Sequence, residues 1–194
     1  MSPEQLRNRI ETVLVRSRNR SAALTDCIDE TELMAQHSPL MSPLVWDLAH
    51  IGSQEELWLV RDVGGRDPVR PDIDELYDAF KHSRSSRTSL PLLTPEEARV
   101  YVQTVRDKAW DVLDHSTFEG RPVEKHGFAF GMIAQHEQQH DETMLATHQL
   151  RSGPAVLTAP APPDSEVPVS GEAVIAGGPF SMGTSLDPWA LDNE

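Results

Sequence analysis

Two histidines, His136 and His140, have the spacing in this chain that most clearly indicates chemistry. They lie four residues apart in the run GMIAQHEQQHDETM. One turn of an α-helix takes about 3.6 residues, so both imidazoles should project from the same face of a helix. Two imidazoles held in this way can bind one metal ion, and the spacing therefore predicts a metal site.

A tight metal site needs a third ligand, and His50 is the strongest candidate among the remaining histidines. It lies in the middle of a predicted helix, in WDLAHIGSQ, where a histidine needs a particular reason. Three imidazoles would bind one side of the ion and leave positions open for water, substrate or oxygen. Because these ligands are neutral, a divalent ion keeps most of its charge, which favours an anionic ligand such as a thiolate. The alternative is that these histidines are hydrogen-bonded core residues and that their spacing is a coincidence.

The same segment also spells H-E-x-x-H, the pattern of zinc peptidases, in which Glu137 would be the general base. The longer metzincin pattern fails, because Ala146 stands where a third histidine is required. A glutamate ligand would have to be Glu166 or Glu172, which lie in or beyond a predicted linker. A peptidase is therefore the weaker hypothesis.

A basic segment, KHSRSSR, lies in a long connection of this otherwise acidic chain. It contains Arg84 and Arg87, three residues apart. Paired arginines suit the recognition of carboxylates, because each guanidinium can bind a carboxylate through two hydrogen bonds. The alternative is a solvated turn with no ligand.

Apolar residues recur at helical spacing in four segments, and these segments must position the candidate ligands. The predicted helices cover about 2–26, 42–63, a stretch from 94 onwards, and about 122–151. Four long amphipathic helices predict a mainly α fold, a four-helix bundle, and bundle cores are a common place for metal sites. Gly52 inside the second helix suggests that a neighbour approaches closely there.

The character of the sequence changes after the fourth predicted helix. Residues 153–170 are rich in proline and alanine, which predicts an extended linker. Residues 171–194 have the pattern of a β-strand, a Gly-Gly-Pro turn and a second short strand. About 24 residues cannot bury a core of their own. We therefore expect residues 1–152 to form the bundle and residues 171–194 to be the incomplete start of a second domain in a larger protein.

Composition excludes several classes of function. The chain has 194 residues and a formal net charge of -14, which argues against a general nucleic-acid-binding surface. Cys27 is the only cysteine, which fits a reducing cytosol. The sequence has no signal peptide and no apolar run of about 18 residues, so we expect a cytoplasmic protein that does not span a membrane.

Three segments in this order resemble the sulfoxide synthases of ergothioneine biosynthesis, also called hercynine oxygenases. They are SPLMSPLVWDLAHIGSQEELWLVRD, GMIAQHEQQHDETML and GGPFSMGTSLDPWALDNE. The resemblance implies a DinB-like four-helix bundle followed by the first strands of a truncated C-type-lectin-like α+β domain, similar to the formylglycine-generating enzyme. It also implies a mononuclear non-haem Fe(II) held by His50, His136 and His140.

The reaction of this family joins a thiol, usually γ-glutamylcysteine, to the imidazole of Nα-trimethylhistidine (hercynine). It consumes O2, forms a C–S bond at the ring and leaves a sulfoxide. The resemblance implies that Arg84 and Arg87 bind the carboxylates of the thiol substrate and that Gln139 hydrogen-bonds the trimethylhistidine. It places the tyrosine acid of the reaction in the remainder of the second domain, so no catalytic acid is expected within these residues. The rival hypothesis is a DinB-like thiol transferase or hydrolase that uses zinc or nickel on the same three histidines.

Overall fold

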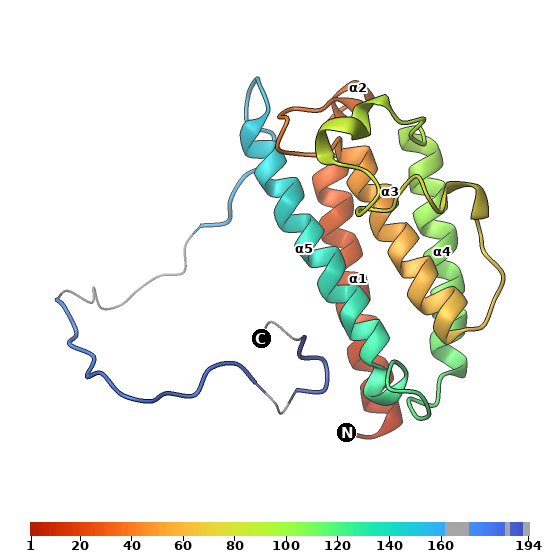
Figure 1. Cartoon of the computed structure of the whole chain (residues 1–194), viewed down its shortest axis with the longest axis vertical. Helices are drawn as coiled ribbons and strands as arrows, with labels where there is room; N and C mark the ends of the chain where they lie inside the picture. The colour runs from red at the N-terminus through yellow and green to blue at the C-terminus, as the bar shows by residue number, and fades with distance from the viewer. Residues whose placement is uncertain (162–170, 185–186, 192–194) are drawn as a thin grey trace.

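The computed structural model describes residues 1–161, 171–184 and 187–191. Its first 150 residues form a bundle of long helices that lie side by side, as Figure 1 shows, which confirms the mainly α prediction. Helix α1 packs chiefly along α5, and α3 packs chiefly along α4. The long helices are α1 (Pro3–Thr25), α3 (Leu44–Glu55), α4 (Pro95–His115) and α5 (Phe128–Leu150).

Two of the helices begin where the sequence predicts. At α1, the Ser2 hydroxyl accepts a hydrogen bond from the Gln5 backbone N–H, and the Gln5 side chain accepts one from the Ser2 N–H. A second capping box, which starts at Thr94, opens α4. The start of α3 differs, because the Ser42 hydroxyl does not cap the helix and instead accepts a hydrogen bond from Arg87 Nη1 at 2.5 Å.

The second predicted helix is continuous but changes its winding. Helix α3 passes directly into η1, a π-helix over Glu56–Val63. Stretches of π-helix are rare and are often found near functional sites. Upstream of this stretch, a Cβ on Gly52 would lie 2.7 Å from Cγ1 of Val102 on α4. The glycine is therefore required by a close helix–helix contact, as its unusual position in the sequence suggested.

Helix α5 starts later than the sequence predicts. The expected start lies near Pro122, whereas α5 begins at Phe128 after the short 3-10 helix η4 (Lys125–Gly127). His126 has φ of 56° and Gly127 has φ of 68°. Both values are left-handed, and two such residues cannot continue a right-handed helix.

The connection between η1 and α4 is packed rather than loose. It holds two 3-10 helices, η2 (Pro71–Ile73) and η3 (Arg84–Ser89). Tyr77 between them is fully buried, and its hydroxyl accepts a hydrogen bond from the Leu93 N–H at 2.8 Å. A further short helix, α2 (Glu30–Met34), contacts α3. In the part of the chain that the structure describes, no helix is long and apolar enough to cross a lipid bilayer.

The predicted pair of β-strands in residues 171–194 is wrong for the residues that the structure describes there. Positions 171–184 and 187–191 contain no strand, and Val174 and Phe180 are 99% and 82% exposed. A short strand pair needs a sheet or a helix to pack against, and residues 171–184, all of which are exposed, have neither. The chain instead runs out from the bundle and returns to the N-terminal end of α5, where Trp189 is buried (Figure 1). Residues 162–170 of the predicted linker lie outside the described residues.

Candidate metal centre

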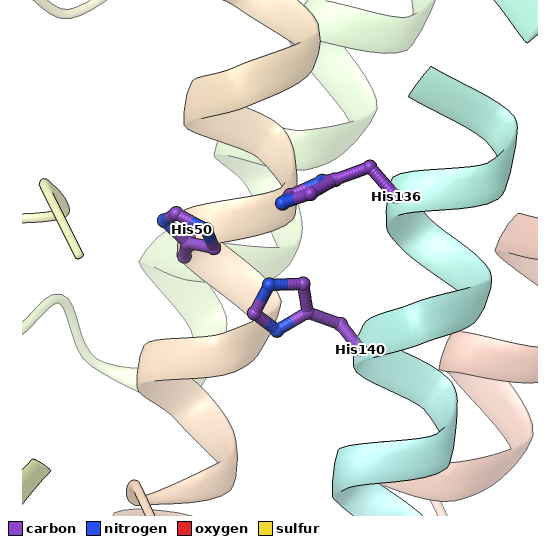
Figure 2. A group of neighbouring side chains, drawn as sticks. All are labelled: His50, His136 and His140. Atoms are coloured by element: carbon purple, nitrogen blue, oxygen red, sulfur yellow. The ribbon is translucent and has the colours of Figure 1, made fainter. Parts of the chain in front are cut away.

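Three histidines from two helices converge between α3 and α5. His50 comes from the middle of α3, and His136 and His140 come from consecutive turns of α5, so that all three rings point toward one another (Figure 2). One ring nitrogen from each lies within 4.8 Å of the others. This arrangement brings together all three of the ligands that the sequence predicts.

Two contacts fix the ring of His50. Its Nδ1 lies 2.7 Å from the carbonyl oxygen of Tyr77, which can only accept a hydrogen bond, so Nδ1 carries the proton. The ring also stacks on Trp46, with centroids 4.7 Å apart and planes 13° from parallel. The Nε2 lone pair of His50 is therefore available to a metal ion.

A buried carboxylate orients His140. Oδ1 of Asp47 lies 3.0 Å from His140 Nδ1 and accepts a hydrogen bond from it. Asp47 is 1% exposed, and its Oδ2 is buried without a hydrogen-bond partner among the described residues. A carboxylate behind a metal-binding histidine fixes the tautomer, leaves Nε2 free to coordinate and makes the imidazole a stronger donor.

His136 has no such support. Within the described residues neither of its nitrogens is assigned a hydrogen bond, and Nδ1 is fully buried. A buried ring nitrogen without a partner costs free energy. A metal ion held by the other two imidazoles would give this ring a partner, so the donor set fits a bound metal.

The electrostatic environment keeps two of the imidazoles neutral. Burial, followed by the charge of neighbouring His140, lowers the pKa of His50 to about 4 and the pKa of His136 to about 3. Metal ions bind the neutral form of histidine. Both rings can therefore bind a metal ion at neutral pH without first losing a proton.

Glu137, the general base of the peptidase hypothesis, faces away from this centre. It is 1% exposed, and its carboxylate accepts hydrogen bonds from Arg18 Nε at 2.7 Å and Arg106 Nη2 at 2.9 Å. Burial alone would raise the pKa of Glu137, but the charges of Arg18 and Arg106 hold it below its usual value. The carboxylate is engaged in the bundle core and cannot serve a metal-bound water, which argues against a peptidase.

The same two arginines bind a second glutamate. Glu55 on α3 accepts hydrogen bonds from Arg106 Nε at 2.5 Å and from Arg18 Nη2 at 2.6 Å. We call Arg18, Glu55, Arg106 and Glu137 the core ion network. Its two positive and two negative charges balance, and it joins α1, α3, α4 and α5. Because Glu137 must face these arginines, the network helps to turn His136 and His140 toward α3.

The structure places the two arginines of the basic segment differently. The Arg87 guanidinium lies over the Trp46 ring, 3.4 Å from its centroid, and Trp46 in turn stacks on His50. Burial lowers the pKa of Arg87, and no carboxylate among the described residues forms an ion pair with it. Arg84 is exposed and donates a hydrogen bond to the carbonyl of Leu40 at 2.8 Å. Arg87 is thus one aromatic ring away from the metal centre, and Arg84 lies farther out.

Gln139 lies directly before His140 on α5 and is exposed. In the described part of the chain its side chain has no assigned hydrogen bond.

Sequence reasoning missed Asp47, the Tyr77 carbonyl and the core ion network. The signal for Asp47 was present, because it is an acid one helical turn before His50 in an otherwise apolar segment. The Tyr77 carbonyl belongs to the backbone and leaves no signal in residue type.

Three curated hercynine oxygenases are similar to the chain. Those of Mycolicibacterium smegmatis and Mycolicibacterium thermoresistibile are each 49% identical over 187 residues, which cover 93% of this chain and 42% and 41% of theirs. That of Mycobacterium tuberculosis is 51% identical over 160 residues, which cover 81% of this chain and 35% of its own.

The chain thus spans less than half the length of these relatives. The sequence model of the DinB superfamily matches residues 14–144, which include all three histidines and the helices that carry them. This match covers more than half of the chain, and the chain belongs to the DinB superfamily.

Proposed function

We propose that this chain is the metal-binding helical part of a non-haem Fe(II), O2-dependent sulfoxide synthase of ergothioneine biosynthesis. The enzyme would form a C–S bond between γ-glutamylcysteine and Nα-trimethylhistidine in the cytoplasm. The observation that carries the proposal is the convergence of His50, His136 and His140 in a chain that is 49–51% identical to hercynine oxygenases.

Fe(II) bound here would supply the one-electron chemistry that O2 requires. The protein side of the site suits that ion, because three imidazoles from two helices would fill three of its coordination positions and leave the others to substrates and O2. The Tyr77 carbonyl and Asp47 hold two of the rings in their binding orientation, so the site is largely formed before the metal enters.

Arg84 and Arg87 suit the carboxylates of the thiol substrate. Arg87 is the better supported of the two, because it is a buried cation without an acidic partner among the described residues. A substrate carboxylate would supply that partner, and the stack of Arg87 on Trp46 would keep the bound thiol close to His50. Gln139 is exposed beside the two α5 ligands and is free to hydrogen-bond the trimethylhistidine.

The tyrosine acid and further substrate contacts would come from a second domain, of which residues 171–194 are the proposed start. The similarity to the relatives covers 93% of this chain and therefore extends beyond the bundle. This supports a common arrangement in which the bundle supplies the metal ligands and the following domain closes the site.

The test is oxygen consumption by the full-length protein after anaerobic loading with Fe(II). We expect uptake that requires both Nα-trimethylhistidine and γ-glutamylcysteine and yields the sulfoxide. Uptake by an iron-loaded enzyme with neither substrate dependence nor sulfoxide product would contradict the proposal. Thiol transfer or hydrolysis with zinc or nickel, in the absence of O2, would support the rival hypothesis.

A further inference from the structure

We infer that residues 187–191 are an anchor, with Trp189 at its centre, which fixes the chain beyond the linker to helix α5 at Gly131 and Gln135. The anchor itself follows from contacts in this structure. Its effect on catalysis rests on the proposed function, because Gln139 belongs to the proposed substrate site.

Trp189 behaves differently from the other large apolar side chains after the bundle. Trp189 is 4% exposed, whereas the large apolar side chains of the preceding segment are between 82% and 99% exposed. Those exposed residues are Val174, Ile175, Phe180 and Met182. The return of the chain to the bundle is therefore confined to one short segment, and one indole ring provides most of its buried apolar surface.

A glycine on α5 makes room for this ring. A Cβ at Gly131 would lie 2.4 Å from Cδ2 of Trp189, so any side chain at this position would displace the indole. A glycine within a helix is less favourable than an alanine. The close approach of Trp189 gives a reason for a glycine at a buried helical position.

Polar contacts fix the orientation of the anchor on α5. The indole Nε1 donates a hydrogen bond to the His126 carbonyl at 2.8 Å, and Gln135 Nε2 donates one to the Trp189 carbonyl at 3.0 Å. These two bonds satisfy one donor and one acceptor of the tryptophan. They give the contact a direction that apolar burial alone would not provide.

Helix α1 closes the other side of the ring. The Arg9 guanidinium lies 3.8 Å from the centroid of the Trp189 ring, and its Nη2 forms an ion pair with Asp187 at 3.3 Å. Asp187 also accepts a hydrogen bond from the Trp189 backbone N–H at 3.0 Å. The indole is thus held between Gly131 of α5 and Arg9 of α1, in a tight turn of its own segment.

The position of the anchor has a consequence for the metal centre. Gly131, Gln135 and Gln139 are four residues apart and share one stripe of α5, and eight residues of helix rise about 12 Å. The anchor occupies the first two positions of this stripe, and Gln139 is the third. It therefore holds the polypeptide within a few helical turns of the proposed substrate site, which raises the effective concentration of the following domain there.

The experiment uses the full-length iron-loaded enzyme and its Trp189→Ala variant, with Val100→Ala as the control because Val100 is an exposed apolar residue on α4, outside the proposed second domain. Hydrogen exchange in α5 measures whether residues 187–191 are docked on the helix. Iron content measures whether the three histidines still bind the metal, and kcat/KM measures the catalytic effect. We expect Trp189→Ala to expose residues 126–135 to exchange, to leave iron content unchanged, and to lower kcat/KM at least about tenfold. Val100→Ala should change none of these.

A second variant distinguishes anchoring from general damage to the fold. Gly131→Ala alone should increase hydrogen exchange in residues 126–135 as much as Trp189→Ala does. The double variant should show no more exchange than Trp189→Ala alone, because the two residues share one contact. Added indole should restore protection in Trp189→Ala and fail to do so when Gly131→Ala is also present.

Two results would overturn the inference. One is exchange in residues 126–135 that is equal in Trp189→Ala and Val100→Ala. The other is increased exchange in Trp189→Ala with unchanged kcat/KM. If the wild-type enzyme shows no oxygen uptake, the proposed function fails. Exchange and iron content would then still decide whether the anchor exists.

Discussion

Two adjacent residues of α5, His136 and Glu137, lie in contrasting surroundings. Burial keeps the imidazole of His136 neutral, and its ring lies with those of His50 and His140 in the candidate metal centre. Glu137 belongs to the core ion network, where every charge is paired and all four long helices meet. One five-residue motif thus serves metal binding on one face of the helix and bundle assembly on another. The H-E-x-x-H motif alone therefore does not identify a peptidase, because the orientation of the helix determines which neighbours each side chain contacts.

The contrast separates two kinds of failure. Damage to the core ion network should lower the stability of the fold, since it leaves buried charges without partners. Damage to the imidazole face should lower metal affinity and leave the bundle folded, because the core ion network stays intact.

The largest effect on stability should come from Glu137→Gln. The substitution keeps the shape of the side chain but leaves Arg18 and Arg106 with one carboxylate instead of two. We expect a loss of about 3–5 kcal/mol in the free energy of unfolding, measured by urea denaturation of the metal-free protein. Glu142→Gln on the exposed side of α5 is the matched control and should have almost no effect. Unchanged stability together with lost activity would instead favour a role for Glu137 as a general base.

His136→Ala should have the largest effect on the metal. It removes one of three ligands, and we expect the affinity for Fe(II) to fall more than about 100-fold, since changes behind a ligand already cost 10- to 100-fold. Circular dichroism should show an unchanged helical content. His115→Ala is the control, because His115 is an exposed histidine far along α4. Iron content equal to the wild type would show that His136 is not a ligand.

Asp47→Asn should have an intermediate effect. The amide keeps the size of the side chain but removes the charge that orients His140 and strengthens it as a donor. We expect about a tenfold loss of Fe(II) affinity, measured by anaerobic titration with a competing chelator. The control is Asp111→Asn on the surface of α4, which should leave the Fe(II) affinity unchanged. Equal Fe(II) affinities for the two variants would show that Asp47 does not support the metal centre.

The smallest effect should be a difference in the pH dependence of stability. The pKa of His50 is lowered from 6.5 to about 4, so between these values the unfolded state binds a proton that the folded state does not. Stability should therefore fall as pH falls below about 7. For an unfolded pKa near 6.5, this histidine contributes a loss of about 0.7 kcal/mol between pH 7 and pH 6.

The metal-free His50→Gln variant should lack this part of the pH dependence. Asp141, with a pKa raised to about 6 by burial, acts in the opposite direction but is common to both proteins and cancels in the difference. Identical pH dependence of the urea midpoint in wild type and variant would contradict a neutral, buried His50.

Local signals in the sequence predict much of this structure. The capping boxes locate the starts of α1 and α4, and the spacing of His136 and His140 places both rings on one helix face. His50 is a reasonable third ligand because a histidine in an apolar helix needs a partner. Each of these inferences depends on residues within a few turns of one another.

The remaining features depend on contacts between distant segments. Ser42 has the residue type of a helix cap but bonds Arg87, which lies 45 residues away. The alternating pattern of residues 171–194 predicts strands, yet a strand forms only where it has a partner to pair with. The burial of Trp189 depends on contacts with Gly131 and Arg9. The residues next to Trp189 in the sequence give no indication of either contact.

The most direct test of the account is a count of the imidazoles bound to Fe(II) in the full-length protein. X-ray absorption of the anaerobic iron-loaded enzyme, measured for the wild type and for His50→Ala, gives this number. The account predicts three imidazoles in the wild type, and two or loss of the iron in the variant. An iron shell with fewer than three imidazoles in the wild type, or an unchanged shell in His50→Ala, would contradict it.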